Sequence, residues 1–158
     1  MDLLELLALI LAGGGVWLWL DSLKAREIGR RAAEQAGQGM DGLRSSINVH
    51  GFVAETSQRA GDIFYGPQAA VMNRIGRERG WPPTSRAQFD GARGPRGALF
   101  VGSPAEVTDK ILAARELFGI DRFLIQMAIG ILDHAELMRA IELFGTRVAP
   151  EIRKAAGA

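Results

Sequence analysis

The sequence predicts an α/β fold of two β/α units, preceded by an apolar helix. Three observations carry this prediction: a strand-type alternation over residues 47–54, a nearly unbroken apolar run over residues 123–127, and a stretch at residues 3–20 in which Glu5 is the only charge. The chain has 158 residues, which leaves room for one domain of ordinary size.

Composition excludes several kinds of chemistry. The chain has no cysteine, so disulfides, thiolate catalysis and thiolate metal sites are all ruled out. A cysteine-free chain also fits a reducing compartment. The net charge of +1 by itself argues neither for nor against nucleic acid.

The N-terminal apolar stretch predicts a membrane anchor. As a helix, residues 3–20 would span about 27 Å, close to the hydrocarbon thickness of a bilayer. Trp17 and Trp19 lie near one end, where indole rings favour the interface. Basic residues follow the stretch and acidic residues precede it: Lys24, Arg26, Arg30 and Arg31 against Asp2 and Glu5.

This charge pattern predicts a single-pass protein of the inner membrane with its C-terminal part in the cytoplasm. The alternative is a cytoplasmic protein in which the stretch is a buried or dimer-forming helix, although Gly13-Gly14-Gly15 weakens that reading. A cleaved signal peptide is disfavoured, because no basic residues precede the apolar core. Residues 1–37, with MDLLELL and VWLWLDSLKAREI, also resemble a family of small single-pass bacterial proteins of unknown function.

The chain divides into three predicted regions: an anchor helix with a basic extension at 1–36, a glycine- and serine-rich linker at 37–46, and a body at 47–158. The body begins with the strand, and Thr56 or Ser57 caps a helix that continues to Gly80. Gly66-Pro67 is expected to interrupt that helix. Residues 82–97 are predicted to form a loop.

A second helix is marked at both ends. Ser103 and Glu106 form a capping box around Pro104, and Gly119 is placed to end the helix in a left-handed conformation. The apolar run at 123–127 then predicts a parallel strand covered on both sides. A further capping box, Asp133 with Glu136, begins the closing helix, which Gly145 and Pro150 are expected to bend; its apolar stripe is Leu137, Ile141, Phe144 and Val148.

The body resembles the C-terminal part of bacterial luciferase-like, flavin-dependent monooxygenases. The likeness covers residues 47–153 and rests on three motifs and a closing helix: HGFVAET at 50–56, VMNRIGRERGWPP at 71–83, GPRGALFVGSP at 94–104, and AIELFGT at 140–146 followed by VAP at 148–150. The resemblance implies a TIM-like barrel that uses reduced FMN, or a related deazaflavin, with molecular oxygen.

A complete barrel of this kind takes about 250 residues and eight strands. The resemblance therefore implies a partial TIM-like barrel that holds only the seventh and eighth β/α units. The six preceding units, which carry most of the flavin contacts in the family, have no counterpart in this sequence.

Four residues are candidates for contact with the cofactor: His50, Gln126, Gly130 and Arg96. His50 lies on the first strand, where it either touches a ligand or packs with one satisfied hydrogen bond. Gln126 and Gly130 lie toward the C-terminal end of the last strand, where barrel enzymes place their sites. Gln126 equally fits a role in holding a neighbouring loop. His134 is expected at the surface, and two isolated histidines do not indicate a metal site.

Arg96 belongs to a segment with six arginines that either bind an anion or form a solvated face: Arg74, Arg77, Arg79, Arg86, Arg93 and Arg96. The helix N-terminus at Ser103 is either a second anion site or simply a cap. Nucleic-acid binding is not expected, because it needs a denser basic patch with stacking aromatics. No catalytic residue is assigned, since the sequence shows no Ser-His-Asp set, paired-carboxylate motif or P-loop.

Two functions follow from the sequence. The first is a flavin-dependent monooxygenase segment that is incomplete and inactive on its own, and active only if another chain or self-association supplies the missing units. Two exposed strand edges make such association physically plausible. The alternative is a non-catalytic, membrane-anchored interaction protein.

Overall fold

The computed structural model describes residues 27–28, 31–32, 34–35, 37 and 44–157. The chain divides into two compact units, residues 1–45 and 46–158, and the second is the body. The predicted anchor at 3–20 lies outside the described residues and stays a prediction. Within the described part, we find no helix with the length and apolarity needed to cross a bilayer.

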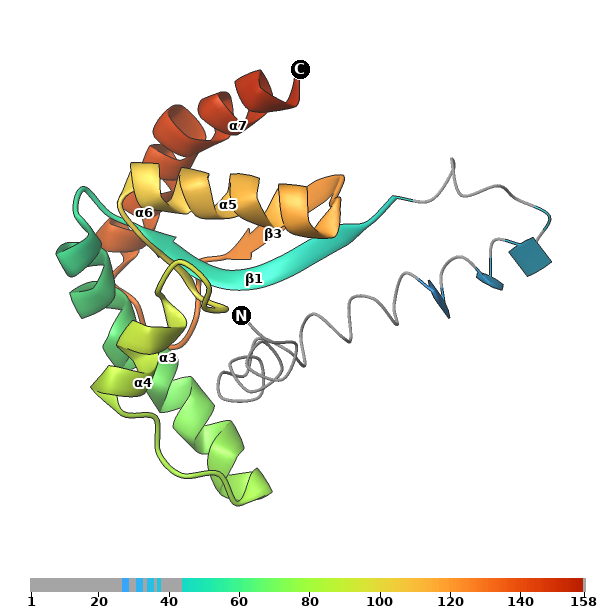
Figure 1. The fold of residues 1–158 in the computed structure, drawn as a ribbon. Coiled ribbons are helices and arrows are strands. Elements are labelled where there is room, and N and C mark those ends of the chain that lie inside the picture. The colour runs from blue at the N-terminus through green and yellow to red at the C-terminus, as the bar shows by residue number, and fades with distance from the viewer. Residues whose placement is uncertain (1–26, 29–30, 33, 36, 38–43, 158) are drawn as a thin grey trace, which may run out of the picture. The chain divides into compact units, whose positions relative to one another are not determined.

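The body contains a parallel sheet of three strands in the order β2-β1-β3 (Figure 1). β1 is Ser46–Val53, β2 is Phe100–Gly102 and β3 is Arg122–Gln126. The prediction of two strands was therefore wrong, because Phe100–Gly102 pairs with Gly51–Val53 as a third. Three residues directly before a helix cap are too few to show a period of two, so only the pairing partner reveals this strand.

The helices lie on both sides of the sheet. α5 (Pro104–Phe118) connects β2 to β3, and α6 (His134–Leu143) follows β3 and continues through a π-helical segment, η2 (Phe144–Val148), into α7 (Ala149–Ala156). Between β1 and β2 the chain forms α3 (Ser57–Arg79) and the short α4 (Arg86–Ala92). Figure 1 shows α5 and α7 on one side of β1, and α3 and α4 on the other.

The predicted helix caps are confirmed. Thr56 Oγ1 accepts from the Arg59 amide at 3.2 Å, Ser103 and Glu106 form the reciprocal capping box, and Gly119 ends α5 at φ 58°. Only half of the second box forms. Asp133 accepts from the Glu136 amide, but the Glu136 carboxylate pairs instead with Arg59 of α3.

Three further expectations were wrong. α3 runs through Gly66 and Pro67 without interruption. The predicted loop at 82–97 contains α4, which begins at a capping box of Ser85 with Gln88 that the sequence analysis overlooked. β3 is not covered on both sides, because its residues alternate between exposed and half-buried. Among the described residues β3 pairs only with β1, so it is an edge strand with one open face.

Candidate functional site, the open face of the sheet

One face of the sheet is polar and open. Parallel pairing aligns Ser46 with Arg122, Asn48 with Leu124, and His50 with Gln126. Partners in a parallel ladder point to the same side, and every second residue shares that side. These six residues therefore form one surface, which we call the open face. All are exposed except His50, which is half-buried, whereas the intervening Ile47, Val49, Phe123 and Ile125 are half-buried or buried.

The structure brings two of the predicted site residues together on this face. His50 and Gln126 are direct register partners. Within the part of the chain that the structure describes, neither side chain makes a hydrogen bond. An imidazole and a primary amide on adjacent strands supply both donors and acceptors to a ligand. Sequence reasoning missed Asn48 and Arg122, although the period of two that runs through His50 also includes Asn48.

The open face ends where α3 begins to cover it. Phe52 is the next residue of β1 on the same side as His50, and its ring stacks on Phe64 of α3 with the centroids 5.5 Å apart. Both side chains are almost completely buried. His50 thus lies at the boundary between the polar surface and an aromatic contact that fixes α3 over the C-terminal end of β1.

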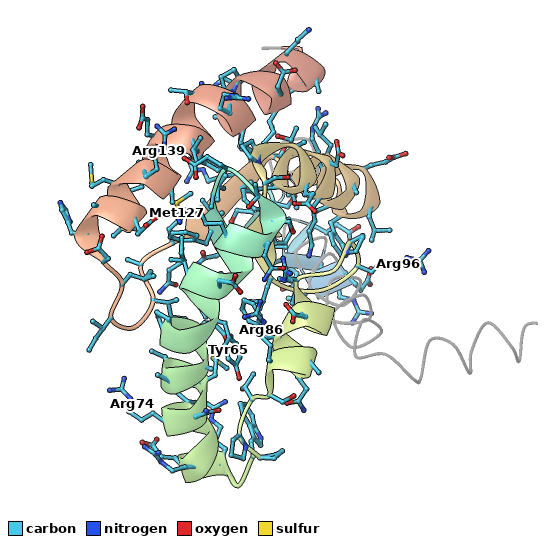
Figure 2. All side chains as sticks on the ribbon, turned by 90° about the vertical axis from the view of Figure 1, so that its left-hand side faces the viewer. Tyr65, Arg74, Arg86, Arg96, Met127 and Arg139 are labelled. Carbon is cyan, nitrogen blue, oxygen red and sulfur yellow. The ribbon has the colours of Figure 1, made fainter. Side chains whose placement is uncertain are left out.

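The other two predicted site residues have different surroundings. Gly130 has φ 64°, and a Cβ there would lie 2.6 Å from the Pro67 carbonyl oxygen. This glycine therefore allows the loop after β3 to pack against the backbone of α3. Arg96 is exposed, and Figure 2 shows its side chain extending away from the helices. The structure does not bring either residue onto the sheet beside His50 and Gln126.

Two of the six arginines in this segment, Arg86 and Arg93, are paired with carboxylates of the protein itself. Arg86 pairs with Asp62 at 2.8 Å and with Asp90 at 2.9 Å, and it lies over the ring of Tyr65 (Figure 2). The Arg93 side chain, only 16% exposed, donates to Asp90 at 2.7 Å and to both oxygens of Ser57. These guanidinium groups hold α4 against the start of α3, and their positive charge is already paired.

The N-terminus of α5 is likewise satisfied internally. The Glu106 carboxylate accepts from the Ser103 amide at 2.8 Å and from Ser103 Oγ at 2.7 Å. Burial acts to raise the pKa of Glu106, but these hydrogen bonds outweigh burial and hold the pKa below its usual value. A carboxylate of the chain occupies the place where an external anion would bind.

Lys110 holds the loop before β2 in place, and sequence reasoning did not single it out. Its ammonium donates to the carbonyl oxygens of Gly94 at 2.6 Å and Leu99 at 2.7 Å, and it lies 5.0 Å from the centre of the Phe100 ring. Burial lowers the pKa of this amine to about 8, so it remains largely protonated at neutral pH. The contacts fasten the loop before β2 onto α5.

The ion pairs around Asp90 predict an acid-sensitive contribution to stability. The hydrogen bond from Arg93 holds the pKa of Asp90 below its usual value; burial opposes this and Arg86 adds to it. A carboxyl group whose pKa is lower in the folded state than in the unfolded state stabilises the fold at pH values above the unfolded-state pKa. This stabilisation is lost as the pH falls through the folded-state pKa. Asp90→Asn should therefore lower the free energy of unfolding at pH 7, and the difference from the parent should shrink between about pH 5 and pH 2.

Urea unfolding of the full chain at about pH 7 and about pH 2 measures the effect. Asp109→Asn, which removes an exposed carboxylate of α5, is the matched control and should have little effect at either pH. An Asp90→Asn difference that is equally large at pH 2 and pH 7 would contradict the assignment.

Two hollows mark the surface of the body. One of about 420 Å³ lies at the first turn of α3, lined by Thr56, Gln58, Arg59, Asp62 and Ile63. The other, about 300 Å³, is apolar and lies between β3 and the α6–η2 helix. Neither includes His50 or Gln126. Among the described residues no group of His, Asp or Glu side chains is arranged to hold a metal ion.

Comparison with known proteins identifies the fold. No protein-family model and no curated protein sequence matches this chain. Among solved structures, the chain matches the monooxygenase RslO1 from Streptomyces bottropensis with a TM-score of 0.60 and 23% identity, over 82% of this chain and 37% of that one. It also matches the oxygenating constituent of 3,6-diketocamphane monooxygenase from Pseudomonas putida, a type II Baeyer-Villiger monooxygenase determined in complex with FMN. That match has a TM-score of 0.56 and 25% identity, over 80% of this chain and 38% of that one.

The chain thus resembles part of luciferase-like flavin monooxygenases, and it spans less than two fifths of the proteins that it matches. Its three-stranded parallel sheet with flanking helices corresponds to part of a TIM-like barrel.

The described residues do not fit FMN unaided. A flavin phosphate needs amide, guanidinium or ammonium donors. Of the donors of that kind in the described residues, those at Ser103 and Arg93 already bind Glu106 and Asp90. Arg122 lies at the opposite end of β3 from Gln126, and Arg96 is not on the sheet. The open face supplies one polar wall but no phosphate cradle.

Proposed function

We propose that this chain is the C-terminal part of a flavin-dependent monooxygenase and that it does not bind flavin or turn over by itself. One observation carries the proposal. The open face presents His50 and Gln126 side by side and without partners among the described residues, on a sheet whose fold matches part of an FMN-bound monooxygenase. In a closed barrel, the part of a sheet face that no helix covers points into the interior, and the site lies toward the strands' C-terminal ends.

The roles of the two residues follow from their chemistry. When bound, reduced FMN would be the group that reacts with molecular oxygen. His50 and Gln126 would orient a bound molecule by hydrogen bonding from one wall, while Phe52 and α3 exclude water from the adjacent end. The phosphate cradle and the remaining walls would come from the β/α units that this chain lacks.

Complementation tests the proposal. The full chain is co-expressed with the part of the Pseudomonas putida monooxygenase that it does not match, and quenching of FMN fluorescence is measured on the purified complex. We expect binding by the complex, weakened about tenfold by His50→Ala or Gln126→Ala. Gln58→Ala, an exposed glutamine on α3 outside the open face, is the control and should leave the affinity unchanged. A complex that forms but takes up no FMN would refute the proposed function.

The alternative function, a non-catalytic membrane-anchored interaction protein, remains a proposal that rests on the sequence of residues 3–20. Deleting residues 1–20 should move the protein from the membrane to the soluble fraction. No redistribution would remove this alternative.

A further inference from the structure

The edge of β3 combines unpaired backbone with one exposed apolar side chain. Within the described part of the chain the sheet stops at β3, which is bonded to β1 on one side only. The free side of such a strand presents a row of backbone donors and acceptors that a further strand pairs with. Leu124, on this strand, is 42% exposed.

An apolar groove runs directly beside this edge. It has a volume of about 300 Å³ and is formed by the end of β3 and by one side of the α6–η2 helix, through Ile125, Met127, Ala128, Leu137, Ile141 and Phe144. Ile141 is 48% exposed, and its neighbour Met138 is also exposed. Contiguous apolar surface of this kind, next to an open strand edge, is typical of a surface that another element covers. We call it the β3–α6 groove.

We propose that the β3 edge and the β3–α6 groove receive a parallel β-strand and the helix attached to it, from a polypeptide that carries the remaining β/α units. This inference rests on the proposed function. The matched monooxygenases extend well beyond this chain, which covers 37% and 38% of them, so more than three fifths of their length lies elsewhere. The strand would continue the parallel sheet, and the apolar side of its helix would fill the groove.

A second copy of this chain fits the surface less well. Two-fold pairing of β3 with its own counterpart would be antiparallel, whereas the matched architecture is parallel. Parallel pairing of β3 with β2 of another copy would use a strand of only three residues. The described residues of two copies would also bring three strands each, six in all, which falls short of the eight in a closed barrel.

The test measures association without flavin. The full chain, in mild detergent, is co-expressed with the unmatched part of the Pseudomonas putida monooxygenase, and complex formation is followed by sedimentation velocity. We expect a one-to-one complex and slowed hydrogen exchange at the β3 amides. Ile141→Asp should weaken association by about thirtyfold, because it places a charge in the groove. Leu117→Asp, on an exposed position of α5 outside the groove, should change it less than about threefold.

Each outcome decides the proposal. No complex, equal weakening by both variants, or a discrete homodimer that Ile141→Asp dissociates would overturn it. Ile141 is half-exposed, so the variant should fold, and an unchanged circular dichroism spectrum verifies this. Because association is read without FMN, a complex that forms but binds no flavin supports the docking surface while refuting the proposed function.

Discussion

Phe64→Ala is expected to lower the free energy of unfolding by about 3–5 kcal/mol, which is a large share of the stability of a small domain. Phe64 is completely buried and stacks on Phe52, which joins α3 to the central strand of the sheet. Truncation removes the transfer free energy of the ring and leaves a cavity that the surrounding structure fills only in part. Urea unfolding of the full chain, monitored by circular dichroism, measures the loss.

Two comparisons make this test specific. Leu117→Ala truncates a side chain that is 60% exposed on α5, and it should cost no more than about 0.5 kcal/mol. Because the two rings share one contact, Phe52→Ala and Phe64→Ala together should cost less than the sum of the single variants. A Phe64→Ala loss as small as that of Leu117→Ala would show that α3 is not held over β1 by this stack.

Gly97→Ala is expected to cost about 3 kcal/mol or more, despite adding a single methyl group. A Cβ at Gly97 would lie 1.9 Å from the Ala92 carbonyl oxygen and 2.4 Å from its carbon. That oxygen accepts from the Leu99 amide at 2.9 Å, and the Leu99 and Gly94 carbonyls in turn bind Lys110. The loop therefore has to open at both of its attachments to accommodate the methyl group.

Gly91→Ala is the matched control for this variant. Gly91 lies within α4, and a Cβ there has no heavy atom within 4 Å. Alanine in a helix interior is favoured over glycine by about 1 kcal/mol, so this variant should be stabilised. Equal thermal unfolding curves for Gly97→Ala and Gly91→Ala would contradict the close packing of Gly97 against Ala92 of α4.

Much of the fold was accessible from sequence because local signals mark it. The caps at Thr56 and Ser103 and the left-handed glycine at Gly119 each depend on a few neighbouring residues, and the structure confirms all three. Elements that depend on partners distant in the sequence could not be predicted. Phe100–Gly102 becomes a strand only through pairing with β1, and the exposure of β3 depends on which elements pack against it.

The candidate site was predicted in part, for the same reason. His50 is one of two histidines in the sequence, and Gln126 is the one polar residue in the apolar run at 123–127, so they could be singled out; the register then places them together. The loop residues Arg96 and Gly130 carried no such pattern to locate them relative to the sheet. The pairing of Arg93 with Asp90 and Ser57, and the contacts of Lys110, join segments that only the folded chain brings into contact.

The most direct test of the account is an FMN titration of the full chain on its own, followed by flavin fluorescence. Arg93 and the Ser103 amide are engaged within the protein, and Arg96 and Arg122 lie apart from His50 and Gln126. The chain should therefore show no saturable FMN binding below about 10 μM, equivalent to roughly 7 kcal/mol. Saturation below that concentration, weakened by Gln126→Ala, would show that this chain forms a flavin site unaided and would contradict the account.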